Sequence, residues 1–188
     1  MPRAPRIDVG GEVYHIVNRS NGRLQIFHTH EDYSIFEKLI KDAQDLIDMR
    51  VLSYCIMPNH WHLVLYPKND GDLSKFMQWL TLTHTQQYRV KTKTIGYGHL
   101  YQGRYKSFLV SKDSYLLQLL RYVEQNPLRA KLVKKSQDWK WGSASKRFDS
   151  KNSSIFSELP IDLPANDLKW KNNLDDKKNL YEIRKSVE

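Results

Sequence analysis

Two apolar runs separated by a short polar turn constrain the fold of this chain more than any other feature. Residues 51–57 (VLSYCIM) and 61–66 (WHLVLY) are rich in β-branched and aromatic residues, which favours strands. Pro58 and Asn59 lie between the runs, and both residue types favour tight turns. The pattern therefore predicts an antiparallel pair of strands in a sheet with a buried face.

The segments before this pair predict a strand followed by a helix. Residues 12–18 (EVYHIVN) alternate and contain β-branched and aromatic residues, as a strand does. Thr29, with Asp32 three residues later, resembles a capping box in which Asp replaces the usual Glu. Apolar residues then recur at helical spacing, which predicts a helix over about residues 31–48.

The segments after the pair predict a second helix, a strand and a third helix. Asp72 is a candidate cap for a helix that reaches about Tyr88. Residues 107–110 are a short strand candidate, and Ser111 or Asp113 can cap a helix that ends near residue 125. The order β-α-β-β-α-β-α predicts an α+β, ferredoxin-like (split β-α-β) antiparallel sheet with helices on one face, plus a C-terminal helix and arm.

The chain is expected to form one domain over residues 1–148, with a polar C-terminal arm or tail over 149–188. No apolar run approaches the ~20 residues needed to cross a bilayer, and residues 1–11 lack the apolar region of a secretory signal. The single cysteine, Cys55, excludes a disulfide framework within the chain and indicates a core residue. We therefore expect a cytoplasmic protein with no membrane partner.

Positive charge is concentrated in one part of the chain. Residues 86–135 contain 11 Lys or Arg and 2 Asp or Glu, a net charge of +9, which equals the net charge of the whole chain. Seven aromatic residues lie in the same segment. Basic side chains neutralise phosphates and aromatic rings stack on unpaired bases, so nucleic acid is the expected partner. A solvated basic surface is the alternative.

The sharpest local motif is Pro-Asn-His-Trp-His at the start of the second strand of the pair. Strand side chains alternate, so His60 and His62 share one face while Trp61 points to the other. Two imidazoles at this spacing can bind one divalent cation, which then needs an oxygen ligand and open positions for phosphate chemistry. Two hydrogen-bonded or solvated histidines are the alternative for an isolated pair of this kind.

A tyrosine and an asparagine one helical turn apart are candidates to complete that site. Tyr122 and Asn126 lie on one side of the third predicted helix, beside its apolar stripe. Asn126 can offer a carbonyl oxygen to a metal, and Tyr122 can offer a phenol beside it. Alternatively, Tyr122 borders the core and Asn126 ends the helix before Pro127.

The chain resembles the single-tyrosine transposases of the HUH nuclease superfamily, and within them the REP-associated tyrosine transposases of bacteria. The matching segments are MPNHWHLVL at 57–65, LYQGRYKSFLV at 100–110, YVEQNPLRAKLV at 122–133 and WKWGSA at 139–144. The resemblance spans residues 8–148 and leaves out the tail. It implies a ferredoxin-like core and cleavage of single-stranded DNA beside hairpins, with a 5′-phosphotyrosine intermediate and a free 3′-hydroxyl.

The resemblance implies a role for each matching residue. His60 and His62 become metal ligands, Tyr122 becomes the nucleophile, and Asn126 becomes the third ligand, where related enzymes use Gln. Mg²⁺ or Mn²⁺ is the expected cofactor. The candidate DNA contacts are Lys91, Lys93, Gln102, Arg104 and Lys106.

Several alternatives stay open from the sequence. A non-catalytic, domesticated DNA- or RNA-binding protein would keep the basic segment without the chemistry. A replication initiator or plasmid relaxase of the same superfamily is disfavoured by the short chain and the lack of a helicase or Walker-type motif. The protein is expected to be a monomer or a homodimer. Tyr115 is the second candidate for the nucleophile, His84 is expected to be a buried core histidine, and His15 to share the sheet face of the pair.

Overall fold

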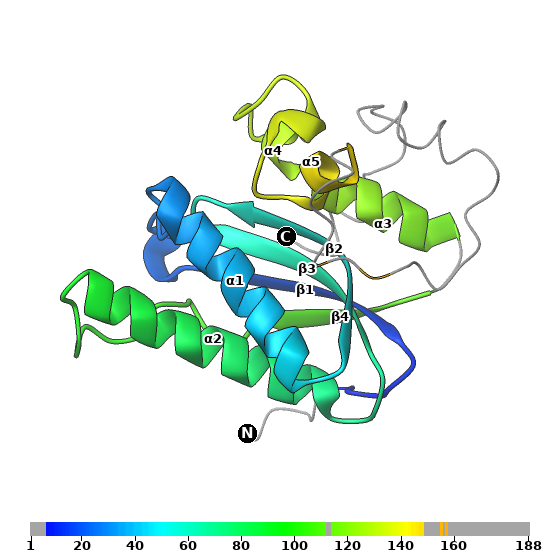
Figure 1. Cartoon of the computed structure of the whole chain (residues 1–188), viewed down its shortest axis with the longest axis horizontal. Helices are drawn as coiled ribbons and strands as arrows, with labels where there is room; N and C mark the ends of the chain where they lie inside the picture. The colour runs from blue at the N-terminus through cyan, green and yellow to red at the C-terminus, as the bar shows by residue number, and fades with distance from the viewer. Residues whose placement is uncertain (1–6, 112–113, 149–154, 156, 158–188) are drawn as a thin grey trace.

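The computed structural model describes residues 7–111, 114–148, 155 and 157. It contains the predicted split β-α-β arrangement, in which a four-stranded antiparallel sheet has the order β2-β3-β1-β4. The elements of this core, shown in Figure 1, are β1 (Val13–Arg19), α1 (His30–Leu46), β2 (Met49–Met57), β3 (His60–Pro67), α2 (Asp72–Lys91) and β4 (Lys106–Val110). The predicted α+β, ferredoxin-like fold is confirmed.

Helices α1 and α2 cover one face of the sheet. Alternate residues of the strands supply this core, including Ile16 of β1, Ile56 of β2 and the fully buried Trp61 of β3. His84 of α2 is buried in the same layer, where its Nδ1 lies 2.6 Å from the Tyr101 hydroxyl. The expectation of a core histidine with a hydrogen-bond partner is confirmed.

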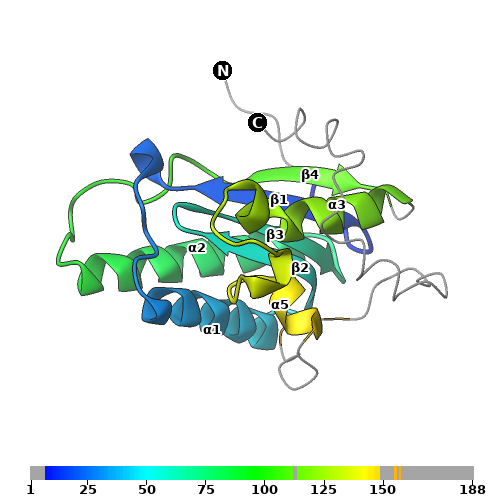
Figure 2. The ribbon, with the colours of Figure 1, turned by 90° about the horizontal axis from the view of Figure 1, so that it is seen from above.

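Helix α3 (Ser114–Glu124) packs on the opposite face. Leu116, Leu120 and Val123 lie against strand residues that point away from α1 and α2, such as Val64 and Cys55. In Figures 1 and 2 the pair α1 and α2 and the helix α3 lie on different sides of the strands. The sheet therefore lies between two layers of helices. The side chains of His60 and His62 point toward the layer that contains α3.

The ends of the helices agree in part with the predictions. Thr29 and Asp32 form the predicted capping box, in which each side chain accepts a backbone N–H of the other. Asp72 is not the cap of α2, because Gly71 takes that position with a φ of 80°, and Asp72 instead begins the helix and accepts two hydrogen bonds from Asn69. The cap predicted at Asp113 lies outside the described residues.

The third helix ends where it was predicted to end. It stops at Glu124, and a separate short helix, α4 (Asn126–Arg129), follows with Pro127 in its first turn. Proline is accepted at that position because the first turn of a helix needs no N–H donor there. Asn126 therefore begins a new turn instead of closing α3.

The chain then returns to the sheet through the 3-10 turn η2 (Ser136–Asp138) and the short helix α5 (Ser143–Phe148). Trp139 and Trp141 are partly buried against the core. Most of the predicted arm at 149–188 lies outside the described residues. Across the part of the chain that is described, no helix is long and apolar enough to cross a membrane.

Candidate active site

The histidine pair lies on the central strand β3, on the face that packs against α3. His60 pairs with Arg19 and His62 with Val17 of the neighbouring strand β1. Both side chains share this face, and Trp61 points into the opposite core, where its indole N–H donates to the Tyr101 hydroxyl over 3.1 Å. The predicted geometry of the motif is confirmed, and hydrogen bonds to the sheet hold its backbone on both sides.

Hydrogen bonds turn one nitrogen of His60 toward the protein and leave the other open. His60 Nδ1 lies 2.7 Å from Asn59 Oδ1. The Asn59 amide nitrogen donates to the Arg23 carbonyl over 3.0 Å, so its oxygen faces His60. An amide oxygen only accepts, so Nδ1 of His60 carries the proton and Nε2 keeps the lone pair that a metal needs.

His62 is oriented by a third histidine, His15 of β1. Nε2 of His15 lies 3.1 Å from Nδ1 of His62, and the two rings lie nearly parallel at an interplanar angle of 14°. When Nδ1 of His62 donates this hydrogen bond, Nε2 of His62 is available as a ligand. The sequence places His15 on the correct face, but not in contact with His62, because that contact depends on the register between β1 and β3.

Burial keeps these imidazoles neutral. Desolvation lowers the pKa of His15 to about 3 and that of His60 to about 4, with a smaller contribution to His60 from the positive charge of Arg19. Burial also holds the pKa of His62 well below its usual range, assisted by the neighbouring His15. Neutral imidazole is the form that binds metals, so burial keeps these side chains in the form that a metal site would need at neutral pH.

Tyr122 lies against the histidines. Its ring centroid is 5.9 Å from that of His62 and 6.1 Å from that of His15, with edge-to-face geometry in both contacts. The guanidinium of Arg129 lies over the Tyr122 ring at 4.8 Å from its centroid. The ring itself is buried, but the residue lines the same cavity as both ligand candidates.

Asn126 presents an oxygen to the same space. Its amide nitrogen donates to the carbonyl oxygens of Tyr122 (2.9 Å) and Val123 (3.3 Å), which directs the donor end toward α3. The carbonyl end is then available to a ligand. Two imidazole nitrogens and one amide oxygen fit a divalent cation such as Mg²⁺ or Mn²⁺ that keeps open positions. The described residues contain no group of three or more His, Cys, Asp or Glu that would form a competing site.

A cavity of about 770 Å³ in front of these residues is strongly basic. Its described lining has no Asp or Glu and has five basic side chains, namely Arg19, Arg23, Arg104, Lys106 and Arg129. Such a surface suits a phosphate backbone. The sequence alone did not identify Arg19, Arg23 and Arg129, because they come from the end of β1, the turn after it and α4, and meet only in the fold.

The five predicted DNA contacts separate into two groups. Gln102, Arg104 and Lys106 line the cavity. Lys93 does not, and Lys91 forms ion pairs with Glu31 (2.7 Å) and Asp32 (2.8 Å) at the start of α1. The segment before β4 is anchored to the protein core, because Leu100, Tyr101 and Tyr105 are buried.

Comparison with known proteins identifies the family of this chain. The model of the IS200-like transposase family matches residues 9–126. A protein of Haemophilus influenzae with the name REP-associated tyrosine transposase is 25% identical over 119 residues, which are 57% of this chain and 66% of the relative. The chain thus spans just under two thirds of that relative's length.

A solved structure of a REP-associated tyrosine transposase bound to a REP hairpin has the same fold. It superimposes with a TM-score of 0.65, over 88% of this chain and 96% of that one, at 16% identity. The family model covers more than half of the chain and includes both histidines, Tyr122 and Asn126. The chain therefore belongs to the IS200-like transposase family, and within it resembles the REP-associated tyrosine transposases.

Proposed function

We propose that this protein is a metal-dependent single-stranded DNA endonuclease and strand transferase. It acts in the cytoplasm beside DNA hairpins such as repetitive extragenic palindromes, with Tyr122 as the nucleophile. The observation that carries the proposal is the position of Tyr122, whose ring lies 5.9 Å from His62 in one cavity with His60 and Asn126. A hairpin is the DNA bound by the solved relative, which supports the choice of substrate.

Each group has a part in the proposed reaction. The basic side chains around the cavity hold the phosphates on either side of the scissile bond. When bound by His60, His62 and Asn126, Mg²⁺ or Mn²⁺ polarises the scissile phosphate. A phenol with an ordinary pKa near ~10 is a poor nucleophile at neutral pH unless it is assisted. The guanidinium of Arg129 lies beside the Tyr122 ring, where its positive charge can offset negative charge that develops during attack.

The bond changes balance without a further reactant. The Tyr122 oxygen bonds to phosphorus as the bond from phosphorus to the 3′ oxygen breaks. The 3′ oxygen gains a proton, and the phenol loses one. The phosphodiester energy is kept in the 5′-phosphotyrosine, so a second 3′-hydroxyl can displace the tyrosine and join two strands.

The test is formation of a covalent adduct. The protein is incubated with a hairpin-bearing oligonucleotide and Mn²⁺ and analysed on a denaturing gel. Tyr122→Phe should abolish cleavage and adduct while DNA binding changes little, and Tyr115→Phe is the matched control in the same helix. An adduct that survives in Tyr122→Phe but not in Tyr115→Phe would reject the assignment. Hairpin binding without any cleavage by the wild-type protein would favour a non-catalytic DNA-binding role.

A further inference from the structure

The segment after α4 covers the free edge of the sheet. Strand β2 is an edge strand, and its Ile56 donates its N–H to the Trp141 carbonyl over 2.8 Å and accepts the Trp139 indole N–H over 3.0 Å. Cys55 forms an isolated antiparallel bridge with Gly142. Residues 139–147, which lie outside the part matched by the family model, are therefore fixed to β2.

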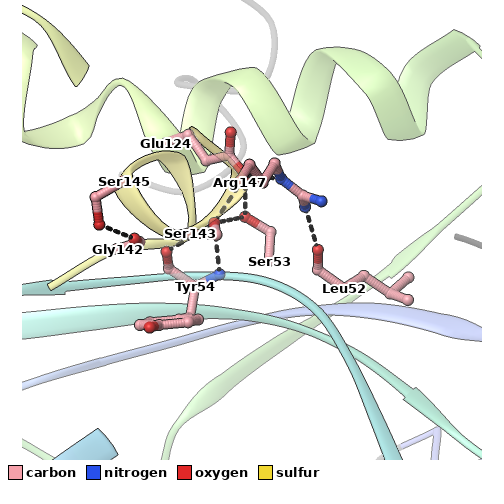
Figure 3. Close-up of polar contacts among 8 residues, drawn as sticks. All are labelled: Leu52, Ser53, Tyr54, Glu124, Gly142, Ser143, Ser145 and Arg147. Atoms are coloured by element: carbon pink, nitrogen blue, oxygen red, sulfur yellow. Dashed lines mark hydrogen bonds and ion pairs between the residues drawn. The ribbon is translucent and has the colours of Figure 1, made fainter. Parts of the chain in front are cut away.

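This segment also contacts the nucleophile helix, through Glu124. One oxygen of the buried Glu124 carboxylate accepts hydrogen bonds from Ser143 (2.7 Å), Ser53 (3.2 Å) and Nε of Arg147 (2.8 Å). Arg147 also donates to the Leu52 carbonyl. Figure 3 shows Ser143 and Arg147 between α3 above and β2 below, so the segment ties the helix to the strand.

The buried Glu124 carboxylate between α3 and β2 is not explained by stability alone. Burying a carboxylate costs solvation, and well-packed apolar residues often replace a buried ion pair without loss. The other Glu124 oxygen, Oε2, is buried without a hydrogen bond to any described residue. Hydrogen bonds depend on direction, so this polar network specifies where the helix lies more closely than an apolar contact would.

The position of the helix matters because Glu124 follows Tyr122 by two residues. At about 100° per residue the two side chains leave the helix on different sides. Tyr122 meets His62 of β3, and Glu124 meets Ser53 of β2. Side chains reach about 5–6 Å from a helix axis, so a rotation of about 10° would move the tyrosine tip by about 1 Å. Displacements of that size are enough to reduce a reaction rate by about 100-fold.

We propose that Glu124, Ser143 and Arg147 form a polar clamp, through which the segment after α4 positions the nucleophile. These three are positioning residues, since none of them lines the cavity that holds Tyr122. The predicted effect of the clamp on the reaction rate rests on the proposed cleavage reaction. Its effect on α3 itself is independent of that reaction.

The first experiment measures the rate of adduct formation in a single turnover, at saturating hairpin DNA and Mn²⁺, together with DNA affinity in EDTA. Glu124→Gln and Arg147→Ala should each lower the rate tenfold or more with affinity unchanged within twofold, and Arg147→Lys should recover part of the rate. Lys146→Ala, an equal loss of charge in the same short helix, should change neither quantity. Equal rates in all variants, or a rate that falls only as DNA affinity falls, would overturn the clamp.

The second experiment needs no catalysis. Amide hydrogen exchange should become faster over residues 119–125 in Arg147→Ala, while α1 and α2 keep their protection. Ser143→Ala is a milder variant for use if Arg147→Ala does not fold. Uniformly faster exchange over the whole domain would show a general loss of stability and reject the clamp. Absence of any adduct in the wild type would reject the proposed function, whereas the exchange pattern would still decide the clamp.

Discussion

Metal binding at the histidine pair is expected to depend little on pH between about pH 7.5 and pH 5, unlike binding at exposed histidines. A proton and a metal compete for the same nitrogen lone pair. Burial lowers the pKa of His60 to about 4 and that of His62 well below its usual range. A histidine with a lowered pKa stays neutral until the pH falls to that value, so the proton competes only in more acidic solution.

The size of the difference follows from the two pKa values. An exposed histidine with a pKa of about 6.5 is only about 3% neutral at about pH 5, which weakens metal affinity about 30-fold for each ligand. With its pKa at about 4, His60 is still about 90% neutral at about pH 5, and the loss is about 1.1-fold. With two exposed histidine ligands, metal affinity at about pH 5 would fall about 1000-fold in total. A titration therefore distinguishes exposed ligands from buried ones easily.

The assay is a Mn²⁺ titration followed by the electron paramagnetic resonance signal of the free ion, in the Tyr122→Phe protein. His62→Ala should remove the binding at every pH, and His28→Ala, an exposed histidine outside the cavity, should leave it unchanged. Circular dichroism at each pH checks that the protein stays folded. A tenfold or larger fall in affinity toward about pH 5 in folded protein would refute the reasoning.

Three further predictions concern DNA affinity and stability. In a plot of log affinity against log salt concentration, each phosphate contact removed should make the slope shallower by about 0.7–0.9. Binding across a salt series should therefore respond to Ala at four residues that line the cavity, Arg19, Arg104, Lys106 and Arg129. It should respond little to Ala at four lysines that do not line the cavity, Lys38, Lys41, Lys68 and Lys75. Burial lowers the pKa of His84 to about 3, so this histidine stays neutral in the folded protein while it takes up a proton in the unfolded chain below about pH 6.5. This group alone should therefore lower the free energy of unfolding by about 2 kcal/mol between about pH 8 and pH 5. In urea unfolding, His84→Gln should show a smaller loss of stability between these two pH values. Gly10→Ala should lower stability in thermal unfolding by about 1–3 kcal/mol, because its Cβ would lie 2.5 Å from the Lys68 carbonyl oxygen, whereas Gly103→Ala has open space and should be neutral.

Local patterns in the sequence were sufficient to predict the core of the fold. The alternation around His60 and His62 fixed which side chains share a face, and Thr29 with Asp32 marked the start of α1. These features depend on neighbours within a few residues. Asp72 shows where such local patterns fail. An Asp near the start of a helix indicates a cap, but in the structure the cap position of α2 is taken by Gly71, which has a left-handed backbone.

Contacts between distant segments were not predictable in the same way. The hydrogen bond between His15 and His62 needs the register of β1 against β3, and the ion pairs of Lys91 need the packing of α2 against α1. The cluster around Glu124 joins residues up to 95 positions apart, counting the bond from Arg147 to Leu52. No period or motif in one sequence encodes such pairings.

The short stretch from Gln102 to Arg104 is presented to the cavity by two buried tyrosines, Tyr101 and Tyr105. The three presented residues are exposed, and neither the sheet nor α3 depends on them for packing. In the proposed reaction this stretch would contact the DNA, whereas the groups that cut it would lie on β3, α3 and α4. Exchange of Gln102 and Gly103 between relatives should therefore change which hairpin is bound best, while Arg104 and the proposed cutting groups on β3, α3 and α4 stay in place.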